Sequence, residues 1–231
     1  MNERPNNPRM MSIREKLARM APRRAIEILG PELLRTPRLV LRPLAETDRA
    51  EFIAAIQESR ADLEPYFDLW QPGDTDDAVF ERQMELTRRG TATGQSCRLG
   101  AFFDDGRFVG CLNLNDIDRA LELRGEASWW VRSNLAGMGL GTEGVRGLLE
   151  YAIGDRFGGG GGLGLCQVVA MLHPDNVSSR RLAERVGMHV DPKAATTVRL
   201  HGAWVPHVVY CKSAGSLVGS RVGMPARSAV A

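Results

Sequence analysis

Three glycines at alternate positions, followed by a helix pattern, constrain this chain more than any other feature. Residues 136–143 read Ala-Gly-Met-Gly-Leu-Gly-Thr-Glu. Residues 126–132 before them (EASWWVR) have the composition of a strand. After them, apolar residues recur at the spacing of one helix face, at Val145, Leu148, Leu149, Ala152 and Ile153. The order strand, glycine loop, helix is therefore predicted.

A loop of this kind is suited to binding an anion. Glycine lets backbone N–H groups approach phosphate oxygens without a Cβ in the way, and a helix N-terminus adds partial positive charge. The spacing is not G-x-G-x-x-G, and the residue 20 positions after Gly141 is Gly161 rather than an acid. Thr142 precedes Glu143, and no lysine stands where a P-loop needs one. We therefore expect a different phosphate-containing ligand, with a plain tight turn as the alternative.

The rest of the body predicts a mixed α/β domain. Strand patterns occur at residues 38–44, 97–103, 107–115, 167–172, 196–200 and 204–211. Helix patterns occur at residues 47–59, 76–89 and 176–186. We expect an N-terminal extension, partly disordered or helical, at residues 1–32, one domain at 33–212, and a disordered tail at 213–231.

Composition excludes several functional classes. The longest nearly apolar run, residues 163–172, is far shorter than the roughly 20 residues that cross a bilayer, and no signal-peptide pattern follows the N-terminus. We expect a cytoplasmic protein with no membrane contact. The four cysteines form no C-x-x-C pair, and no two histidines stand at i, i+4 on a helix, so no metal is expected. Residues 36–211 hold 19 basic and 24 acidic groups, which disfavours direct DNA binding.

A second constellation begins 39 residues after Gly137 and reads Asn176-x-x-Ser179-x-x-Leu182-x-Glu184-x-x-Gly187. In order and spacing, the two segments together resemble the GNAT superfamily of acyl-CoA-dependent N-acetyltransferases, and within it the RimJ/RimL type. The opening of that type is similar to residues 34–43 (LRTPRLVLRP), and its closing hairpin to residues 200–205 (LHGAWV). The resemblance covers about residues 33–212.

The resemblance implies a single GNAT-like α/β domain with a mixed, mostly antiparallel sheet, splayed at its centre and flanked by helices on both faces. It also implies acetyl-CoA as cosubstrate. The pyrophosphate would lie on the loop formed by Ala136, Gly137, Met138, Gly139, Leu140, Gly141 and Thr142. The pantetheine arm would lie between residues 126–132 and 167–172, touching Trp130, Val131, Arg132, Asn176 and Ser179. Ala136 departs from the family, which often has Gln or Arg there.

The implied reaction moves an acetyl group to a primary amine. Many family members use a Tyr where this chain has Ala183, so Ser179 is the candidate proton donor, with a local backbone hydrogen bond as its alternative role. Asp191 matches a family carboxylate and is a candidate base, although the following Pro192 equally favours a turn. Glu126 is the competing base, and a substrate-positioned water is the third option.

The acceptor is less constrained. Tyr66, Trp70, Asn115 and Trp129 are candidates to line its site, each with simple packing as the alternative. The RimJ/RimL resemblance implies the N-terminal α-amino group of a protein, such as a ribosomal protein, and contact with the ribosome. A small amine (a polyamine, amino acid or aminoglycoside) is the alternative acceptor. A non-catalytic acyl-CoA-binding module is the second alternative, and a monomer or homodimer is expected.

Overall fold

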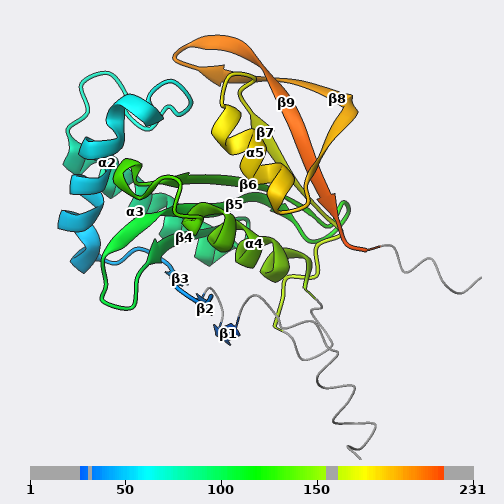
Figure 1. The fold of residues 1–231 in the computed structure, drawn as a ribbon, viewed down its shortest axis with the longest axis horizontal. Helices are drawn as coiled ribbons and strands as arrows, with labels where there is room; N and C mark the ends of the chain where they lie inside the picture. Colours follow the sequence, from blue (N-terminus) through cyan, green and yellow to red (C-terminus); the bar gives the residue numbers. More distant parts are fainter. Residues whose placement is uncertain (1–26, 31–32, 155–160, 216–231) are drawn as a thin grey trace, which may run out of the picture.

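The computed structural model describes residues 27–30, 33–154 and 161–215 (Figure 1). Its strands are β1 Glu27–Gly30, β2 Leu33–Arg35, β3 Val40–Arg42, β4 Cys97–Phe102, β5 Phe108–Asp118, β6 Arg124–Val131, β7 Gln167–Leu172, β8 His189–Leu200 and β9 Ala203–Ser213. Its helices are α2 Arg49–Leu63, α3 Asp76–Thr93, α4 Leu140–Ile153 and α5 Val177–Arg185, with short 3-10 turns η1 Glu46–Asp48 and η2 Ser133–Leu135. Most of the predicted extension and tail lies outside the described residues.

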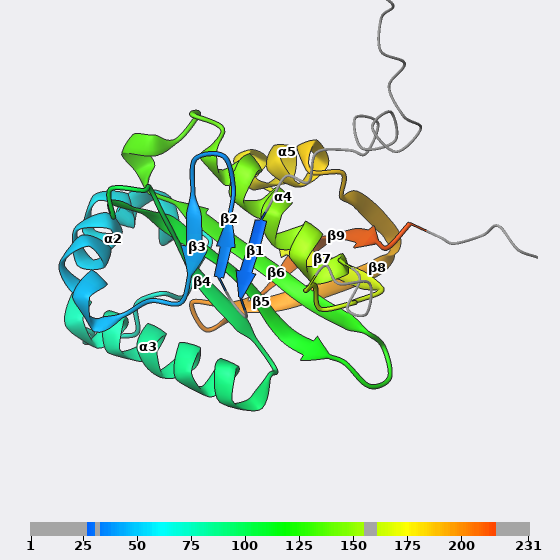
Figure 2. The same ribbon diagram turned by 90° about the horizontal axis from the view of Figure 1, so that it is seen from below.

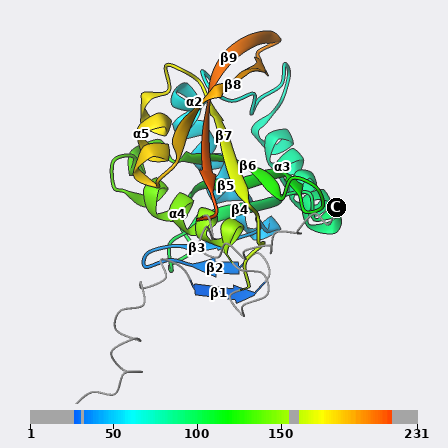
Figure 3. The same ribbon diagram turned by 90° about the vertical axis from the view of Figure 1, so that its right-hand side faces the viewer.

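The described strands form one open sheet in the order β1-β2-β3-β4-β5-β6-β7-β9-β8. Each neighbouring pair is antiparallel except β6–β7, which is parallel. Helices α2 and α3 cover one face, and α4 and α5 cover the other, as two turned views show (Figures 2 and 3). The predicted mixed, mostly antiparallel sheet with helices on both faces is confirmed.

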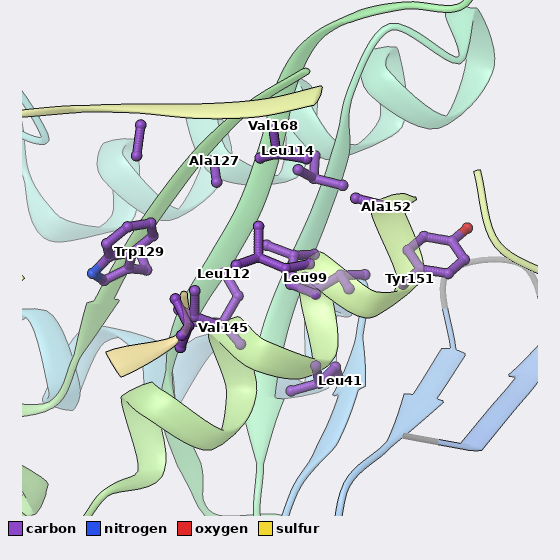
Figure 4. Packing of buried hydrophobic residues seen from close by; sticks show 14 of the residues in the cluster. Leu41, Leu99, Leu112, Leu114, Ala127, Trp129, Val145, Tyr151, Ala152 and Val168 are labelled. Atoms are coloured by element: carbon purple, nitrogen blue, oxygen red, sulfur yellow. The ribbon is translucent and has the colours of Figure 1, made fainter. Parts of the chain in front are cut away.

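Helix α4 packs against the centre of the sheet with a glycine at the contact. Val145 and Leu148 of α4 are fully buried in the same hydrophobic cluster as Leu112 of β5. Figure 4 shows Val145 and Leu112 in this cluster. A Cβ built on Gly144 would lie 2.6 Å from Leu112 Cδ1, which is closer than real Cβ contacts come. A glycine inside the helix therefore sets the distance between α4 and β5, and with it the position of the glycine loop at the start of α4.

Several element boundaries differ from the sequence-based expectation, and two of these differences have an identifiable cause. Helix α3 continues past Arg89 to Thr93, because Gly90 is a point of close approach rather than a stop: its Cβ would lie 2.0 Å from Ser96 Oγ. Strand β8 begins at His189 instead of residue 196. Its pairing with β9 breaks between Val190 and Ala195, so the turn-like residues there form an irregularity within one strand.

Candidate active site

The sheet opens where β6 and β7 part. These parallel strands pair only from Arg124–Gln167 to Glu126–Val169. Beyond that point β6 stays with β5 as far as Val131, while β7 stays with β9 as far as Leu172. The predicted splay is therefore present, between the two predicted strands. A cavity of about 580 Å³ lies at this opening, lined by the end of β6, residues 135–137 and 139–142, the start of α5 and the end of α2.

One edge of β6 faces this opening with its backbone groups unused by β7. The Arg132 N–H donates to Val109 O at 2.8 Å, so the backbone of Arg132 points toward β5. Because N–H and C=O groups alternate along a strand, Trp130 also points toward β5, whereas Trp129 and Val131 point to the open edge. Of the three residues predicted to bind the ligand through their backbone, Trp130 and Arg132 point toward β5 and Val131 points toward the opening. Val131 lies at the open edge, while the Arg132 side chain pairs with Glu58 at 2.7 Å.

The glycine loop, residues 136–142, has a physical reason for each glycine. Gly137 and Gly139 have φ angles of 79° and 77°, which favour a residue without a side chain. At Gly141 the limit is space, because a Cβ there would lie 2.9 Å from Leu182 Cδ1 and 3.2 Å from Val131 Cγ2, so these side chains would have to shift. A side chain would therefore strain the backbone at Gly137 or Gly139 and displace neighbouring side chains at Gly141.

The loop presents an uncapped helix start to the cavity. Helix α4 has Gly139 as its N-cap, and no side chain caps it. The first N–H groups of a helix have no partner within the helix, and they carry partial positive charge. The loop residues that line the cavity are Ala136, Gly137, Gly139, Leu140, Gly141 and Thr142. Met138 does not line the cavity, and 54% of it is exposed to solvent.

Asn176 and Ser179 meet at the start of α5, where both line the cavity. Asn176 is the N-cap, and its Oδ1 accepts from the Ser179 backbone N–H at 3.0 Å. Within the described part of the chain, the Ser179 hydroxyl has no protein partner, so it is available to a ligand. Ala183 is fully buried in the core. The cavity has a tyrosine of its own, Tyr66, whose hydroxyl donates to Asp175 O at 3.5 Å.

The two candidate bases lie in different surroundings. Glu126 is half-buried and is the last residue of β6 to pair with β7. Burial raises the pKa of Glu126, the charge of Asp116 raises it further, and Arg124 opposes them. Asp191 lies on β8, where its Oδ1 accepts from the Lys193 backbone N–H at 3.0 Å. Neither carboxylate lines the cavity.

The four acceptor-site candidates are not brought together. Tyr66 and Trp129 line the cavity. Trp70 is held between α2 and α3, where its Nε1 donates to Asp76 Oδ1 at 3.1 Å and Arg60 lies over its ring. Asn115 belongs to a polar group on the sheet face beneath α3: its Oδ1 accepts from Arg98 at 2.8 Å.

Sequence reasoning missed two features beside these residues. The Arg98 guanidinium also donates to Gln83 Oε1 at 2.7 Å, and burial lowers its pKa. The His173 ring lies between those of Tyr66 and His207, with centroids 5.6 Å apart in each pair; it is tilted against Tyr66 and perpendicular to His207. No sequence spacing links these residues, because the contacts join different strands and helices.

The residues present fit a long ligand with a phosphate group. The indole N–H of Trp129 is buried in the cavity wall and has no acceptor among the described residues. The uncapped start of α4 and the open edge of β6 supply further N–H donors to the same space. Within residues 27–30, 33–154 and 161–215, no group of three His, Cys, Asp or Glu side chains could hold a metal ion. No described helix is both long and apolar enough to cross a membrane.

Comparison with known proteins gives concordant results. A family model described as "Acetyltransferase (GNAT) domain" matches residues 38–189. The chain is 27% identical over 180 residues to the "Probable N-acetyltransferase YjcK" of Bacillus subtilis (strain 168), covering 77% of this chain and 94% of that protein.

Solved structures share the fold. RimJ of Mycobacterium smegmatis, in complex with CoA-disulfide, matches with a TM-score of 0.65 and 21% identity, covering 79% of this chain and 85% of that one. The ribosomal-protein-S5-alanine acetyltransferase of Vibrio fischeri matches with a TM-score of 0.64 and 15% identity, covering 80% and 97%. At these identities the likeness is one of fold.

Proposed function

The chain belongs to the GNAT acetyltransferase family, whose members are acetyl-CoA-dependent acyltransferases, and we propose that it acetylates the N-terminal α-amino group of another protein. The observation that carries the proposal is a single cavity that joins three features. These are the uncapped start of α4, the open edge of β6 and the unpartnered hydroxyl of Ser179. When bound, acetyl-CoA supplies the acetyl group as a thioester that a neutral amine attacks.

Each of these features has a proposed task in binding. The backbone N–H groups of residues 137–142 bind the diphosphate, assisted by the partial positive charge of the helix start. The backbone of Trp129 and Val131 hydrogen-bonds the amide groups of the pantetheine arm, as a neighbouring strand would. Asn176 holds the first turn of α5 in place through its bond to the Ser179 N–H.

Ser179 and Glu126 are the proposed proton-transfer residues. The Ser179 hydroxyl is free to donate a hydrogen bond to the departing sulfur. Glu126 accepts the proton of the attacking amine through a water, since it does not line the cavity itself. Its raised pKa makes it a stronger base than an ordinary glutamate. We prefer Glu126 to Asp191, whose carboxylate already accepts a local backbone hydrogen bond.

The proposed acceptor follows from charge and from the reaction. Asp62 and Asp175 line the cavity, and they suit an amine that is cationic before it reacts. An α-amino group has a reference pKa of about 8 against about 10.4 for lysine, so it needs less help from a base. RimJ and the S5-alanine acetyltransferase share this fold. By analogy, we propose a ribosomal protein as acceptor and contact with the ribosome as a consequence.

Thiol release from acetyl-CoA by the full chain tests the proposal. The amine panel holds peptides beginning with Ala, Ser, Thr, Met or Asp, together with spermidine, free amino acids and an aminoglycoside. We expect turnover on one class of peptide. Gly139→Val is the negative control, because a β-branched residue cannot adopt a φ of 77° without strain.

Two outcomes would contradict the acceptor assignment. Turnover on a small amine with none on the peptides would identify a small-molecule acetyltransferase. Silence across the whole panel, with CoA still raising the melting temperature, would rule out these peptide N-termini as acceptors.

A further inference from the structure

The segment that resembles the opening of RimJ/RimL sequences lies directly behind the glycine loop. Thr36 Oγ1 donates to Glu143 Oε1 at 2.6 Å, and the Arg38 backbone N–H donates to the same oxygen at 2.8 Å. Arg38 Nε donates to the other oxygen, Glu143 Oε2, at 2.6 Å. Arg38 Nη1 also donates to Met138 O at 3.1 Å. One arginine therefore joins the first turn of α4 to the middle of the loop.

We propose that Arg38 and Glu143 are positioning residues that hold the glycine loop ready for the diphosphate of acetyl-CoA. The inference rests on the assignment of that diphosphate to the loop. Neither residue lines the cavity, so both act through the backbone of residues 138–143. The resemblance alone assigned no task to this segment.

The first argument is geometric. Gly137 and Gly139 have no side chains, and that of Met138 is 54% exposed, so the loop has little of its own to fix its shape. The bond from Arg38 to Met138 O lies between the two left-handed glycines. At its other end, Arg38 is anchored to Glu143, which is part of α4. Arg38 thereby ties the loop to α4, whose first N–H groups bind the same diphosphate in the proposed function.

The second argument is electrostatic. Glu143 lies in the first turn of α4, and its side chain is only 14% exposed. Burial by itself would raise the pKa of Glu143, but hydrogen bonds from Thr36 and Arg38 and the charge of Arg38 outweigh it, so the pKa falls. Glu143 is therefore a carboxylate beside an anion site. Arg38 neutralises a charge that would otherwise repel the diphosphate.

A comparison of CoA with pantetheine, which lacks the diphosphate and the nucleotide, tests this inference. Calorimetry on the full chain measures the dissociation constant for CoA, and displacement measures that for pantetheine. We expect Arg38→Gln to weaken CoA by about tenfold, because it removes charge-assisted bonds from a half-exposed residue. Pantetheine binding should be unchanged, which a general loss of structure would not produce.

Removing the charge of Glu143 tests the electrostatic argument separately. If Arg38 neutralises Glu143, then Arg38→Gln combined with Glu143→Gln should bind CoA more tightly than Arg38→Gln alone. Arg35→Gln is the matched control, since Arg35 lies in the same segment but pairs at 2.6 Å with the exposed Asp104. Its CoA affinity should equal that of the unaltered chain.

The inference is overturned if Arg38→Gln leaves CoA affinity unchanged, or if it weakens CoA and pantetheine equally. Should Arg38→Gln be too unstable to titrate, Arg38→Lys keeps the charge without the fork of donors, and Glu143→Gln tests the other end. Wild-type affinity in both of these variants would equally contradict the inference. A chain that binds CoA but acetylates no peptide would refute the proposed acceptor and leave this inference standing.

Discussion

Gly137→Ala isolates the conformational requirement of the glycine loop from any effect of packing. Gly137 has a φ angle of 79°, and a Cβ built on it has nothing within 4 Å. The substitution therefore introduces no clash, and its whole effect comes from placing an L side chain in the left-handed region. That conformation costs about 1–2 kcal/mol.

The structure indicates where this energy will be expressed. The neighbouring Met138 O is held by one hydrogen bond from Arg38, whose side chain is 47% exposed. Such a bond contributes about 0.5–1.5 kcal/mol, which is less than the upper range of the strain. The loop of the free variant should therefore relax, and CoA must restore the strained conformation when it binds. The dissociation constant for CoA should rise by about five- to thirtyfold, with little change in melting temperature.

Calorimetry with CoA and a thermal melt of the same samples check this expectation. Gly137→Asn is the matched control, because asparagine tolerates the left-handed region better than alanine, and it should bind CoA more tightly than Gly137→Ala. The reasoning fails if Gly137→Ala binds CoA as the unaltered chain does and is equally stable. It fails also if the alanine and asparagine variants are indistinguishable.

Three further expectations concern the core, the base and α5. Gly144→Ala should destabilise the fold by about 1–3 kcal/mol, because its Cβ would lie 2.6 Å from Leu112 Cδ1. Denaturant unfolding measures this loss, and adding Leu112→Val to the variant should restore part of it. Glu126→Gln should lower kcat/KM by about 10²–10⁴-fold. Because the pKa of Glu126 is raised in the folded state, this carboxyl stabilises the fold at low pH and loses that effect as pH rises through its folded pKa, so Glu126→Gln should raise the melting temperature at neutral pH. If the pH dependence of kcat/KM were the same in Glu126→Gln as in the unaltered chain, Glu126 would not be the base. Ser179→Ala should reduce kcat without loss of stability, because the N-cap of α5 uses the Ser179 backbone N–H and not its hydroxyl. Asn176→Ala removes the cap and should cost about 1 kcal/mol of stability. Equal melting temperatures for the two variants would contradict this expectation.

Local patterns in the sequence predicted strands β3 to β9 and helices α2 to α5, whereas the short strands β1 and β2 were not predicted. The strand, glycine loop and helix at residues 126–153 could be read directly, because spacing along the chain determines amphipathicity and conformational freedom. The cap of α5 could be placed for the same reason, since Asn176 and Ser179 are one turn apart. The predicted end of helix α3 was wrong, because Gly90 is needed for close packing against Ser96 and does not end the helix.

Site residues that depend on long-range pairing could not be ranked from the sequence. Trp129, Trp130, Val131 and Arg132 are consecutive, yet only the pairing with β5 decides which backbone groups face the opening. The sequence offered Trp70 either as an acceptor-site residue or as a packing residue, and it gave no sign that the Trp70 indole donates to Asp76. Short-range spacing contains no information on which edge of a strand is left without a partner.

The sequence by itself determined that a helix begins after a glycine-rich loop, and that these glycines cannot be replaced freely, because backbone conformation is a local property. The tertiary structure alone decided that β7 leaves β6 after Glu126 and opens a cavity at that point. It alone joined Arg38 to Glu143, residues 105 positions apart. Such contacts depend on the order of the strands in the sheet, because that order brings distant segments of the chain together.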